Sequence, residues 1–593
     1  MSIVPLVKVT VYGHAADKEQ VLAGLQNLGC LHLISLAPDQ AARAAGPSPE
    51  ARTALRFLQR CPRQRRQVRD PGRFDAEEVE RRALEIRTRI REREDELDGL
   101  RARIQELRPW GDFRLPPLEE LGGNRLWFYI VPHRDLERVK TAGLVHEVVS
   151  RDLQYAYVVA VSPDEPQGMP VERTRAGQRP LSEVRQRLED VALEIEDLQG
   201  EREALTRWCL LFGRSLSQLE DRANLRDAMG LTYDSAPLFA LQGWAPTDRE
   251  DALQRFAHLR RLALDMEGPS EKDAPPTLLR NAAALQGGEA LVSFYMTPNY
   301  WLWDPSGVVF FSFAVFFAMI LSDAGYAAVM AAGLALGWRR LGRSPTGGRL
   351  RLLFATLVGA SLLWGALVGS YFGVTPGADS PLAGLKLLDL GDNTTMMTLA
   401  VLVGVAHVVL ANAADAWRRR RSAAVLAPLG WMALLVGAVV VWVGSAHAGP
   451  GVQRTGLWAM GLGAAAVLLF TGVRAPLGKR LLQGLLALTR VSSAFGDVLS
   501  YLRLFALGLA SASLALAFND LAAQVATAVP GLGKLLALLV LLIGHGLNFL
   551  LGITSGFIHG LRLNFIEFFN WSIPEEGTPF RPFSRKESSS WSR

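Results

Sequence analysis

Between residues 307 and 570 the chain carries long apolar blocks in which charged side chains are almost absent. Residues 1 to about 300 carry Arg, Asp and Glu in nearly every window, although the 593-residue chain is 49% hydrophobic and only 21% charged. Apolar blocks of this length are typical of membrane-spanning helices. The sequence therefore predicts a cytoplasmic N-terminal domain over 1–300, a membrane domain over 301–575 and a polar C-terminal tail over 576–593.

The soluble half contains the sequence patterns of two long helices and of α/β lobes at their ends. Its first segments, VPLVKVTVYG, DKEQVLAGLQNLG and CLHLISL, follow the order strand, helix, strand. Apolar residues then recur at spacings of three and four over about 76–108 and 180–210, as in a coiled coil. Strand-like sequence lies between these two stretches, so we expect the chain to leave along one helix and return along the other. The predicted lobes are 1–75, about 110–170 and 210–285.

The expected fold class is an α-helical membrane protein with an N-terminal α/β soluble region. This region is predicted to be a dumbbell of two lobes joined by an intramolecular antiparallel coiled coil, followed by about eight transmembrane helices. The last two of these helices should be long and tilted. A parallel coiled coil between two copies is the alternative, but two stretches within one chain pair without any dependence on concentration.

Several functional classes find no support in the sequence. The soluble half has no phosphate-binding loop, no dinucleotide fingerprint and no His and carboxylate cluster at metal-ligand spacing, so we expect neither cofactor nor metal. Cys30, Cys61 and Cys209 fit no disulfide framework and are interpreted as reduced thiols. The N-terminus does not resemble a secretion signal, which indicates a cytosolic first half. The net charge of +6 does not imply a nucleic-acid partner.

The flanks of the apolar blocks predict the topology, because loops rich in Lys and Arg stay on the cytoplasmic side. With a cytosolic N-terminal domain, the alternation of basic loops predicts eight spans in a plasma membrane and requires the first block to cross twice. The break is expected near Asp323, and each half would reach only ~22 Å against ~30 Å of hydrocarbon. A single crossing gives seven spans and an outward N-terminal domain. The basic segments are 338–351, 417–421, 474–480 and the RPFSRK tail.

The last two blocks, 481–522 and 531–570, are too long for one crossing, because about 40 helical residues reach ~60 Å. They must tilt, break or project from the membrane. Their polar residues are spaced to share helix faces, which suggests a hydrated path or a charged contact at membrane depth. One face carries Ser493, Asp497, Ser500 and Arg503, and the other carries His545, Asn548, Gly552, Ser555, His559 and Arg562.

Simpler interpretations of these polar residues remain open. Arg503 could reach the interface from within the membrane, although apolar sequence extends on both sides of it. Arg562 could form an interfacial ion pair with Glu567, and His559 could make only a helix–helix hydrogen bond. Asp323 could equally be a turn or helix cap.

Two motifs separated by about fifty residues resemble the signature of one membrane-protein family. SYLRLFALGLA at 500–510 and HGLRLNFIE at 559–567 are similar to paired segments of the a or I subunit of V-type and archaeal-type rotary ATPases. Three further segments, DAGY at 323–326, WGALVGSYFG at 364–373 and PPTLLRN at 275–281, also resemble the family, so the likeness covers essentially the whole chain.

The resemblance implies a stator subunit that provides two ion half-channels for protons or sodium. Arg503 would face a ring of proteolipid subunits (c or L), each carrying a membrane carboxylate, and would separate the half-channels because a guanidinium keeps its proton. Further residues implied to serve the ion pathway are Arg562, His559, Asp497, Glu567, Asp323, Ser500 and Ser555.

The resemblance also implies partners beyond the ring and the lipid bilayer. The soluble lobes would hold the peripheral stalk subunits (E and G) and meet the subunit associated with the central stalk, whereas nucleotide chemistry would occur on other subunits. The chain departs from eukaryotic members at Asp497, where they carry histidine, and at Ser511 and Gly552, where many relatives carry ionisable groups. The alternatives are a self-contained secondary transporter, with a polar site between the last two helices, and a scaffold without ion flux.

Overall fold

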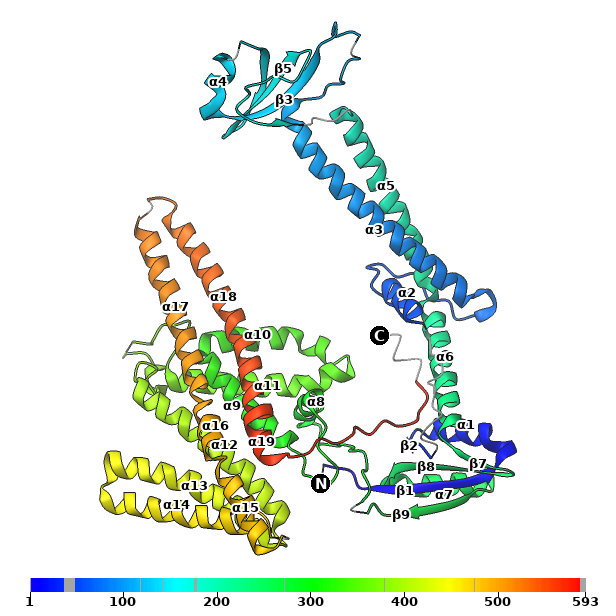
Figure 1. Cartoon of the computed structure of the whole chain (residues 1–593), viewed down its shortest axis with the longest axis vertical. Coiled ribbons are helices and arrows are strands. Elements are labelled where there is room, and N and C mark those ends of the chain that lie inside the picture. Colours follow the sequence, from blue (N-terminus) through cyan, green and yellow to red (C-terminus); the bar gives the residue numbers. More distant parts are fainter. Residues whose placement is uncertain are drawn as a thin grey trace. The chain divides into compact units, whose positions relative to one another are not determined.

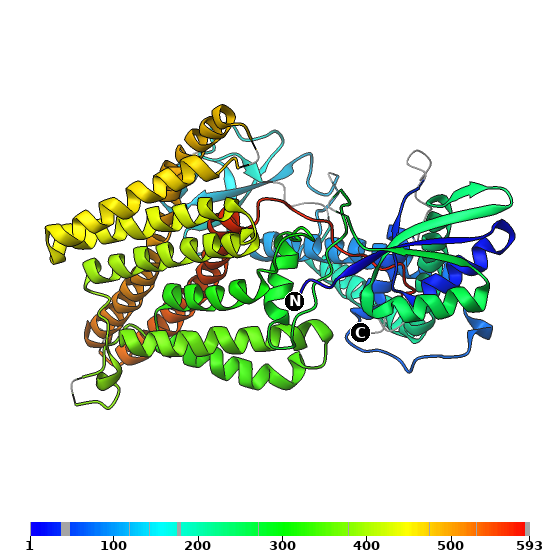
Figure 2. The same cartoon turned by 90° about the horizontal axis from the view of Figure 1, so that it is seen from below.

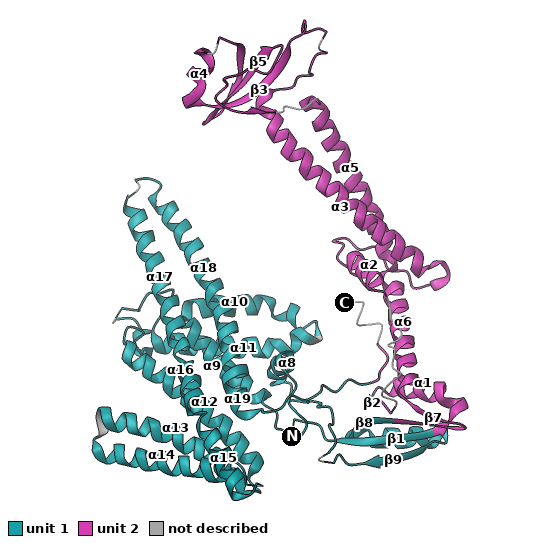
Figure 3. Cartoon of the chain, viewed as in Figure 1, with its two compact units in different colours: residues 1–12, 30–34, 242–582 teal, residues 13–29, 35–241, 583–593 magenta. Residues whose placement is uncertain are grey.

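Figures 1 and 2 show the computed structural model of the chain from two directions. The chain divides into two compact units (Figure 3): unit 1 comprises residues 1–12, 30–34 and 242–582, and unit 2 comprises 13–29, 35–241 and 583–593. Arg474 of a predicted basic loop and residues 587–593 of the predicted tail lie outside the described residues. The structure describes residues 2–36, 48–117, 119–141, 143–174, 179–270, 272–377, 379–473, 475–528 and 530–586.

Two long helices dominate unit 2, α3 (Ala76–Leu107) and α5 (Leu181–Leu205). Ile90 of α3 packs with Leu198 near the end of α5, whereas Leu107 at the end of α3 packs with Leu181 at the start of α5. The helices therefore run antiparallel, side by side (Figure 1). The predicted supercoil of this pair stays a prediction.

Two positions on the apolar seam of this pair hold arginine, and both side chains find partners beyond the seam. Arg93 forms an ion pair with Glu194 on the opposite helix at 3.0 Å. Arg202 stacks on the ring of Phe57, 4.1 Å from its centroid, and donates a 2.7 Å hydrogen bond to the Phe57 carbonyl. Their aliphatic stems cover the seam while their charged ends leave it, so the heptad pattern tolerates them.

A four-stranded antiparallel sheet lies between α3 and α5 in the chain, with strand order β4-β5-β3-β6. Tyr129, Val131 and Val158 form its core against one short helix. This is the region predicted as a distal lobe. Its elements are β3 (Arg125–Pro132), α4 (Leu136–Thr141), β4 (Val145–Arg151), β5 (Tyr155–Ser162) and β6 (Arg173–Thr174).

The second sheet has the strand order β2-β8-β1-β9, with β7 beside β8, and the boundary between the units passes through β1 and β8. Its strands are β1 (Leu6–His14), β2 (His32–Ile34), β7 (Tyr233–Ser235), β8 (Leu238–Pro246) and β9 (Ala263–Glu267). The remaining helices of the N-terminal half are α1 (Lys18–Leu28), α2 (Pro49–Gln59), α6 (Cys209–Gly230) and α7 (Glu250–Arg260).

The apolar helices of unit 1 gather in one bundle (Figure 2). They are α8 (Gln286–Tyr295), α9 (Ser306–Leu321), α10 (Ala324–Leu341), α11 (Pro345–Val368), α12 (Asn393–Arg419), α13 (Leu426–Val443), α14 (Pro450–Phe470), α15 (Leu477–Leu488), α16 (Val491–Leu499), α17 (Leu502–Ala528), α18 (Gly533–Arg562) and α19 (Phe569–Ser572).

Six helical stretches of the described residues are long and apolar enough to cross a membrane, by length and composition. The first apolar block breaks at the expected place, because Ser322 adopts a left-handed φ of 46° between α9 and α10. Since α9 has only 16 residues, the count of eight spans stays a prediction. The six stretches are 346–368, 393–419, 423–446, 450–470, 477–528 and 533–572.

The last two long blocks behave differently from each other. The first is interrupted before α16 and again at Ser500 and Tyr501. Of the three expected outcomes, tilting, breaking or projecting, this block therefore breaks. The second stays helical through α18 and then widens into a π-helical segment, η10 (Leu563–Phe568). Helices α17 and α18 pack side by side in both views (Figures 1 and 2).

Candidate functional site

The tyrosine of the SYLRL segment anchors the start of α17. Tyr501 is 0% exposed, and its hydroxyl shares a 2.7 Å hydrogen bond with Nδ1 of His407 on α12. Gly404 allows this approach, because a Cβ at that position would lie 2.8 Å from the Tyr501 ring. Leu504 is also fully buried. These two inward side chains determine the rotation of α17 and thereby the position of Arg503 between them.

Arg503 has a carboxylate neighbour but no close hydrogen bond to it. Its Nη1 lies 3.9 Å from Oε1 of Glu567, beyond normal hydrogen-bond length. The Arg503 side chain is 22% exposed, whereas that of Glu567 is 3% exposed. Arg503 Nη1 and Glu567 Oε2 are both buried without a hydrogen-bond partner among the described residues. The pair is thus held by charge attraction and leaves hydrogen-bonding capacity unused.

The π-helical segment explains why Glu567 is in this position. A π-turn adds a residue to the helical repeat and rotates everything that follows it. Glu567 lies in η10 with its neighbours Asn564 and Phe568, all of them buried. Periodicity at 3.6 residues per turn does not predict such a segment, so the sequence could nominate Glu567 but not its approach to Arg503.

The other predicted residues of the paired motifs lie close to this pair. His559 and Arg562 of α18 interact electrostatically with Arg503, and Ser500 adjoins the Glu567 carboxylate. Arg562 is exposed at the end of α18, and Nδ1 of His559 is buried without a partner in the described part of the chain. The structure therefore brings Arg503, Glu567, His559, Arg562 and Ser500 together.

Asp497 and Ser555 lie near the paired motifs but form no hydrogen bond with Arg503. Asp497 on α16 accepts a 2.8 Å hydrogen bond from Nε1 of Trp571, which ties the start of the SYLRL region to α19. Ser555 is half-buried on α18, one turn before His559. Asp497 therefore connects α16 to α19, and Ser555 lies on the helix that the sequence pattern predicts for it.

Asp323 is a fully occupied cap. It is 2% exposed and accepts hydrogen bonds from the Tyr326 N–H at 2.9 Å, the Ser370 hydroxyl at 2.7 Å and the N–H groups of Phe372 and Gly373 at 3.0 Å. Four donors use most of the capacity of one carboxylate. The cap interpretation therefore accounts for its conformation, and the carboxylate joins the α9–α10 break to residues 370–373.

A hydrogen-bonded network that the sequence did not reveal lies farther along α17 and α18. The Tyr326 hydroxyl bonds to His545 Nδ1 at 2.8 Å and receives a 3.0 Å hydrogen bond from Asn548 Nδ2. His545 Nε2 lies 3.0 Å from Asn519 Oδ1, and Asn548 also donates to the Ser511 carbonyl at 2.8 Å. His545 and Asn548 are on the predicted stripe, but Tyr326 and Asn519 carried no periodic signal.

The predicted polar stripe of α18 divides into two parts in the structure. Asn548 and Gly552 are buried against neighbouring helices, while His545, Ser555 and His559 are half-buried and Arg562 is exposed. Glycines on the buried side let other helices approach, since a Cβ at Gly556 would lie 2.6 Å from Phe317. The part of the stripe at Asn548 and Gly552 therefore packs against other helices. The other stripe residues keep part of their surface exposed.

Fixed charge and proton exchange are the chemistry that this arrangement offers. A guanidinium that keeps its proton lies beside one carboxylate and one imidazole, both of which exchange protons readily. Within the described ranges, no group of three or more His, Cys, Asp and Glu side chains is arranged to hold a metal ion.

Comparison with known proteins identifies the chain's relatives. No family model matches the chain. It is 26% identical to the V-type ATP synthase subunit I 1 of Treponema pallidum, over 98% of this chain and 100% of that protein. It is also 26% identical to the V-type ATP synthase subunit I of Chlamydia pneumoniae, over 86% of both chains. The A-type ATP synthase subunit I of Methanocaldococcus jannaschii is 25% identical over 67% of this chain and 63% of its own length.

These relatives span bacteria and archaea and agree with the paired SYLRL and HGLRL motifs in pointing to one multi-pass membrane protein. The chain is thus similar over nearly its whole length to subunit I of V-type and A-type ATP synthases, and these relatives support a membrane subunit of a rotary complex.

Proposed function

We propose that this chain is the stator that provides two ion half-channels and presents Arg503 to the carboxylates of a turning proteolipid ring. A proton entering through one half-channel neutralises a ring carboxylate, which then faces lipid at low cost. When that site turns to the second half-channel, the fixed positive charge of Arg503 favours the ionised carboxylate and promotes proton release. Proton translocation is thereby coupled to rotation, and to ATP synthesis or hydrolysis elsewhere in the complex.

The observation that carries this proposal is the unsatisfied state of Arg503. Its Nη1 has no hydrogen-bond partner in the described residues, its side chain is partly exposed, and Glu567 stays 3.9 Å away. A guanidinium in a structural ion pair normally makes short, paired hydrogen bonds to its carboxylate. Arg503 makes no such short bond within the part of the chain that the structure describes, and the 22% of its side chain that stays exposed leaves it accessible to a carboxylate from another subunit.

Neighbouring residues support the same role. Arg562 adds a second, exposed positive charge, and His559 and Glu567 are proton-exchanging groups beside it. We propose that these residues, with Ser500, Asp497 and Ser555, line the route by which protons reach and leave the ring. Asp323 contributes by holding the α9–α10 break against residues 370–373.

The N-terminal half takes its proposed role from the family. We propose that residues 1–300 lie in the cytoplasm, that their lobes hold the peripheral stalk and meet the central-stalk-associated subunit, and that nucleotides bind on other subunits. The complex would lie in the plasma membrane. The secondary-transporter alternative is not favoured, because the relatives are named as subunits of an ATP synthase.

The deciding experiment measures ATP-driven proton uptake by vesicles that contain the reconstituted complex with Arg503→Lys. Lysine loses its proton more easily when buried, so coupled uptake should fall at least about tenfold while the subunit composition stays unchanged. Arg420→Lys, in the exposed basic loop after α12, is the matched control and should pump normally. Full pumping by the Arg503→Lys complex would overturn the proposal.

A further inference from the structure

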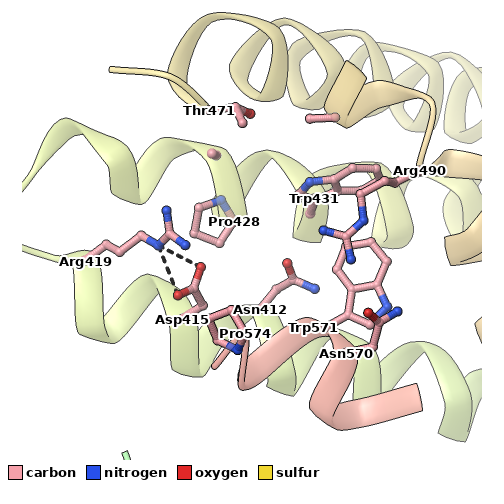
Figure 4. Close-up of a pocket in the computed structure, with 12 residues that line it drawn as sticks. Asn412, Asp415, Arg419, Pro428, Trp431, Thr471, Arg490, Asn570, Trp571 and Pro574 are labelled. Atoms are coloured by element: carbon pink, nitrogen blue, oxygen red, sulfur yellow. Dashed lines mark hydrogen bonds and ion pairs between the residues drawn. The ribbon is translucent and has the colours of Figure 1, made fainter. Parts of the chain in front are cut away.

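Two cavities lie beside α13, and Trp431 is in the lining of both; Figure 4 shows the first of them. The first has a volume of about 160 Å³ and is lined by polar, charged and aromatic residues, among them Asp415, Arg419, Arg490 and Trp571. The second has a volume of about 530 Å³ and is lined almost wholly by apolar side chains of α12, α13, α14 and α16. Because both linings include Trp431, the two cavities adjoin, and we take them as the charged end and the apolar end of one groove.

The charged end carries excess positive charge. Asp415 forms ion pairs with Arg418 at 2.6 Å and with Arg419 at 2.8 Å, so its single charge is shared between two arginines. Arg490 stacks on Trp571, 4.9 Å from the ring, and has no carboxylate partner among the described residues. Figure 4 shows Arg419 and Arg490 reaching the pocket from opposite sides. The cavity is lined by two arginines and one aspartate, and that aspartate also pairs with Arg418 outside the lining, so this end is suited to an anion.

The apolar end has the length of one membrane leaflet. Along α13 it extends from Trp431 to Trp442, about 11 residues or ~17 Å of helix, which is roughly half of the ~30 Å hydrocarbon core. Phe495 and Trp442 remain 66% and 42% exposed on its rim. The apolar end therefore opens to the surroundings of the chain along its length.

The charged end lies where a membrane interface is expected. It is formed by the ends of α12 and α15 next to the basic segments 417–421 and 474–480. Basic pockets between membrane helices at such an interface bind anionic headgroups, and tryptophan rings favour the same level. A free inorganic anion would satisfy the arginines but would leave the apolar end empty.

We propose that this groove binds one anionic glycerophospholipid, with its phosphate between Arg419 and Arg490 and one acyl chain lying along α13 toward Trp442. The lipid joins the α13–α14 hairpin to α16, the helix that leads into the SYLRL segment. This site is separate from Arg503 and does not depend on the proposed ion pathway.

The experiment uses the purified complex in vesicles of phosphatidylcholine with a small fraction of phosphatidylglycerol that carries a photoreactive acyl chain. After illumination, labelled peptides of the chain are mapped by mass spectrometry. Labels should concentrate on α13 and α16, and unlabelled phosphatidylglycerol should compete, whereas inorganic phosphate should not.

Two kinds of variant separate the headgroup from the acyl chain. Arg490→Gln removes one headgroup contact and should lower phosphatidylglycerol labelling about tenfold, the factor expected for one charged hydrogen bond. Ala438→Phe fills the groove from its exposed wall and should remove the label while the arginines stay intact. Arg349→Gln, exposed at the start of α11, is the matched control and should change nothing.

Three results would overturn the proposal. Even labelling of all lipid-facing helices would show a general lipid surface, and competition by inorganic phosphate would show a simple anion site. Cross-links from α13 or α16 to another subunit, with no lipid label, would show that a protein covers the groove.

Discussion

The Nη1 atom of Arg503 lies 3.9 Å from Oε1 of Glu567, and each side chain keeps one buried polar atom without a hydrogen-bond partner in the described residues. Buried ion pairs usually offset their loss of hydration with short hydrogen bonds. This pair does not, so it is held loosely, and only the Arg503 side chain, 22% exposed against 3% for Glu567, remains accessible from outside the chain. The proposed release and rebinding of ring carboxylates requires that Arg503 form no tight ion pair within its own chain.

Replacing Glu567 with glutamine should slow coupled pumping without preventing assembly. The change removes the carboxylate charge that lies 3.9 Å from Arg503, so the guanidinium would hold a ring carboxylate longer and delay its reprotonation. We expect proton uptake by vesicles to fall about tenfold, equivalent to ~1.4 kcal/mol on the slow step. Glu575→Gln, at an exposed position just beyond α19, should pump normally. Unchanged uptake in Glu567→Gln would contradict this role.

Replacing Tyr501 with phenylalanine should destabilise the membrane domain by about 1–3 kcal/mol, because it leaves buried His407 without its partner. His407 Nε2 already lacks a partner within the described chain, so the whole imidazole would then be unpaired. Thermal unfolding of the detergent-solubilised complex measures the loss. The double variant with His407→Leu should recover part of it, and Tyr233→Phe at an exposed site should be neutral. Equal stabilities of the single and double variants would argue against an unpaired histidine as the cause.

Two glycines on α18 should respond oppositely to alanine. A Cβ at Gly544 would lie 2.4 Å from the Phe518 ring of α17, so Gly544→Ala should separate the helices and cost about 1–3 kcal/mol. A Cβ at Gly546 meets nothing within 4 Å, so Gly546→Ala should be neutral or stabilising by up to about 1 kcal/mol. Both are measured by thermal unfolding of the complex. A loss of similar size in both variants would mean that helix packing is not the reason.

Cys209 should resist alkylation in the native protein well above pH 9. Burial raises the pKa of its thiol from 9.0 to about 11, and only the thiolate reacts. The folded state therefore holds this proton more tightly than the unfolded state, and the stability that results is complete below pH 9 and disappears as pH rises through 11.

The measurement is the rate of iodoacetamide labelling from pH 8 to 11, with and without denaturant. Cys209→Ser assigns the slow thiol by removing it. Labelling of native Cys209 at pH 9 as fast as in denaturant would contradict the assigned burial.

The resemblance to subunit I and the nomination of Arg503 came from the sequence, because both depend on local patterns. Apolar blocks, basic flanks and the spacing of SYLRL and HGLRL are readable along the chain, and Arg503 stands out because charge is rare in such blocks. The break near Asp323 could also be predicted from a local signal, because an aspartate next to small residues interrupts the apolar run there.

Tertiary structure decided which polar residues meet and which only pack. The π-helical segment turns Glu567 toward Arg503, and no periodic pattern signals it. Helix packing buries Asn548 and Gly552 of the α18 stripe, and the Tyr326–His545 hydrogen bond joins residues 219 positions apart in the chain. Contacts of that separation depend on how whole helices pack, so the sequence determined the chemistry available at membrane depth and the fold determined its partners.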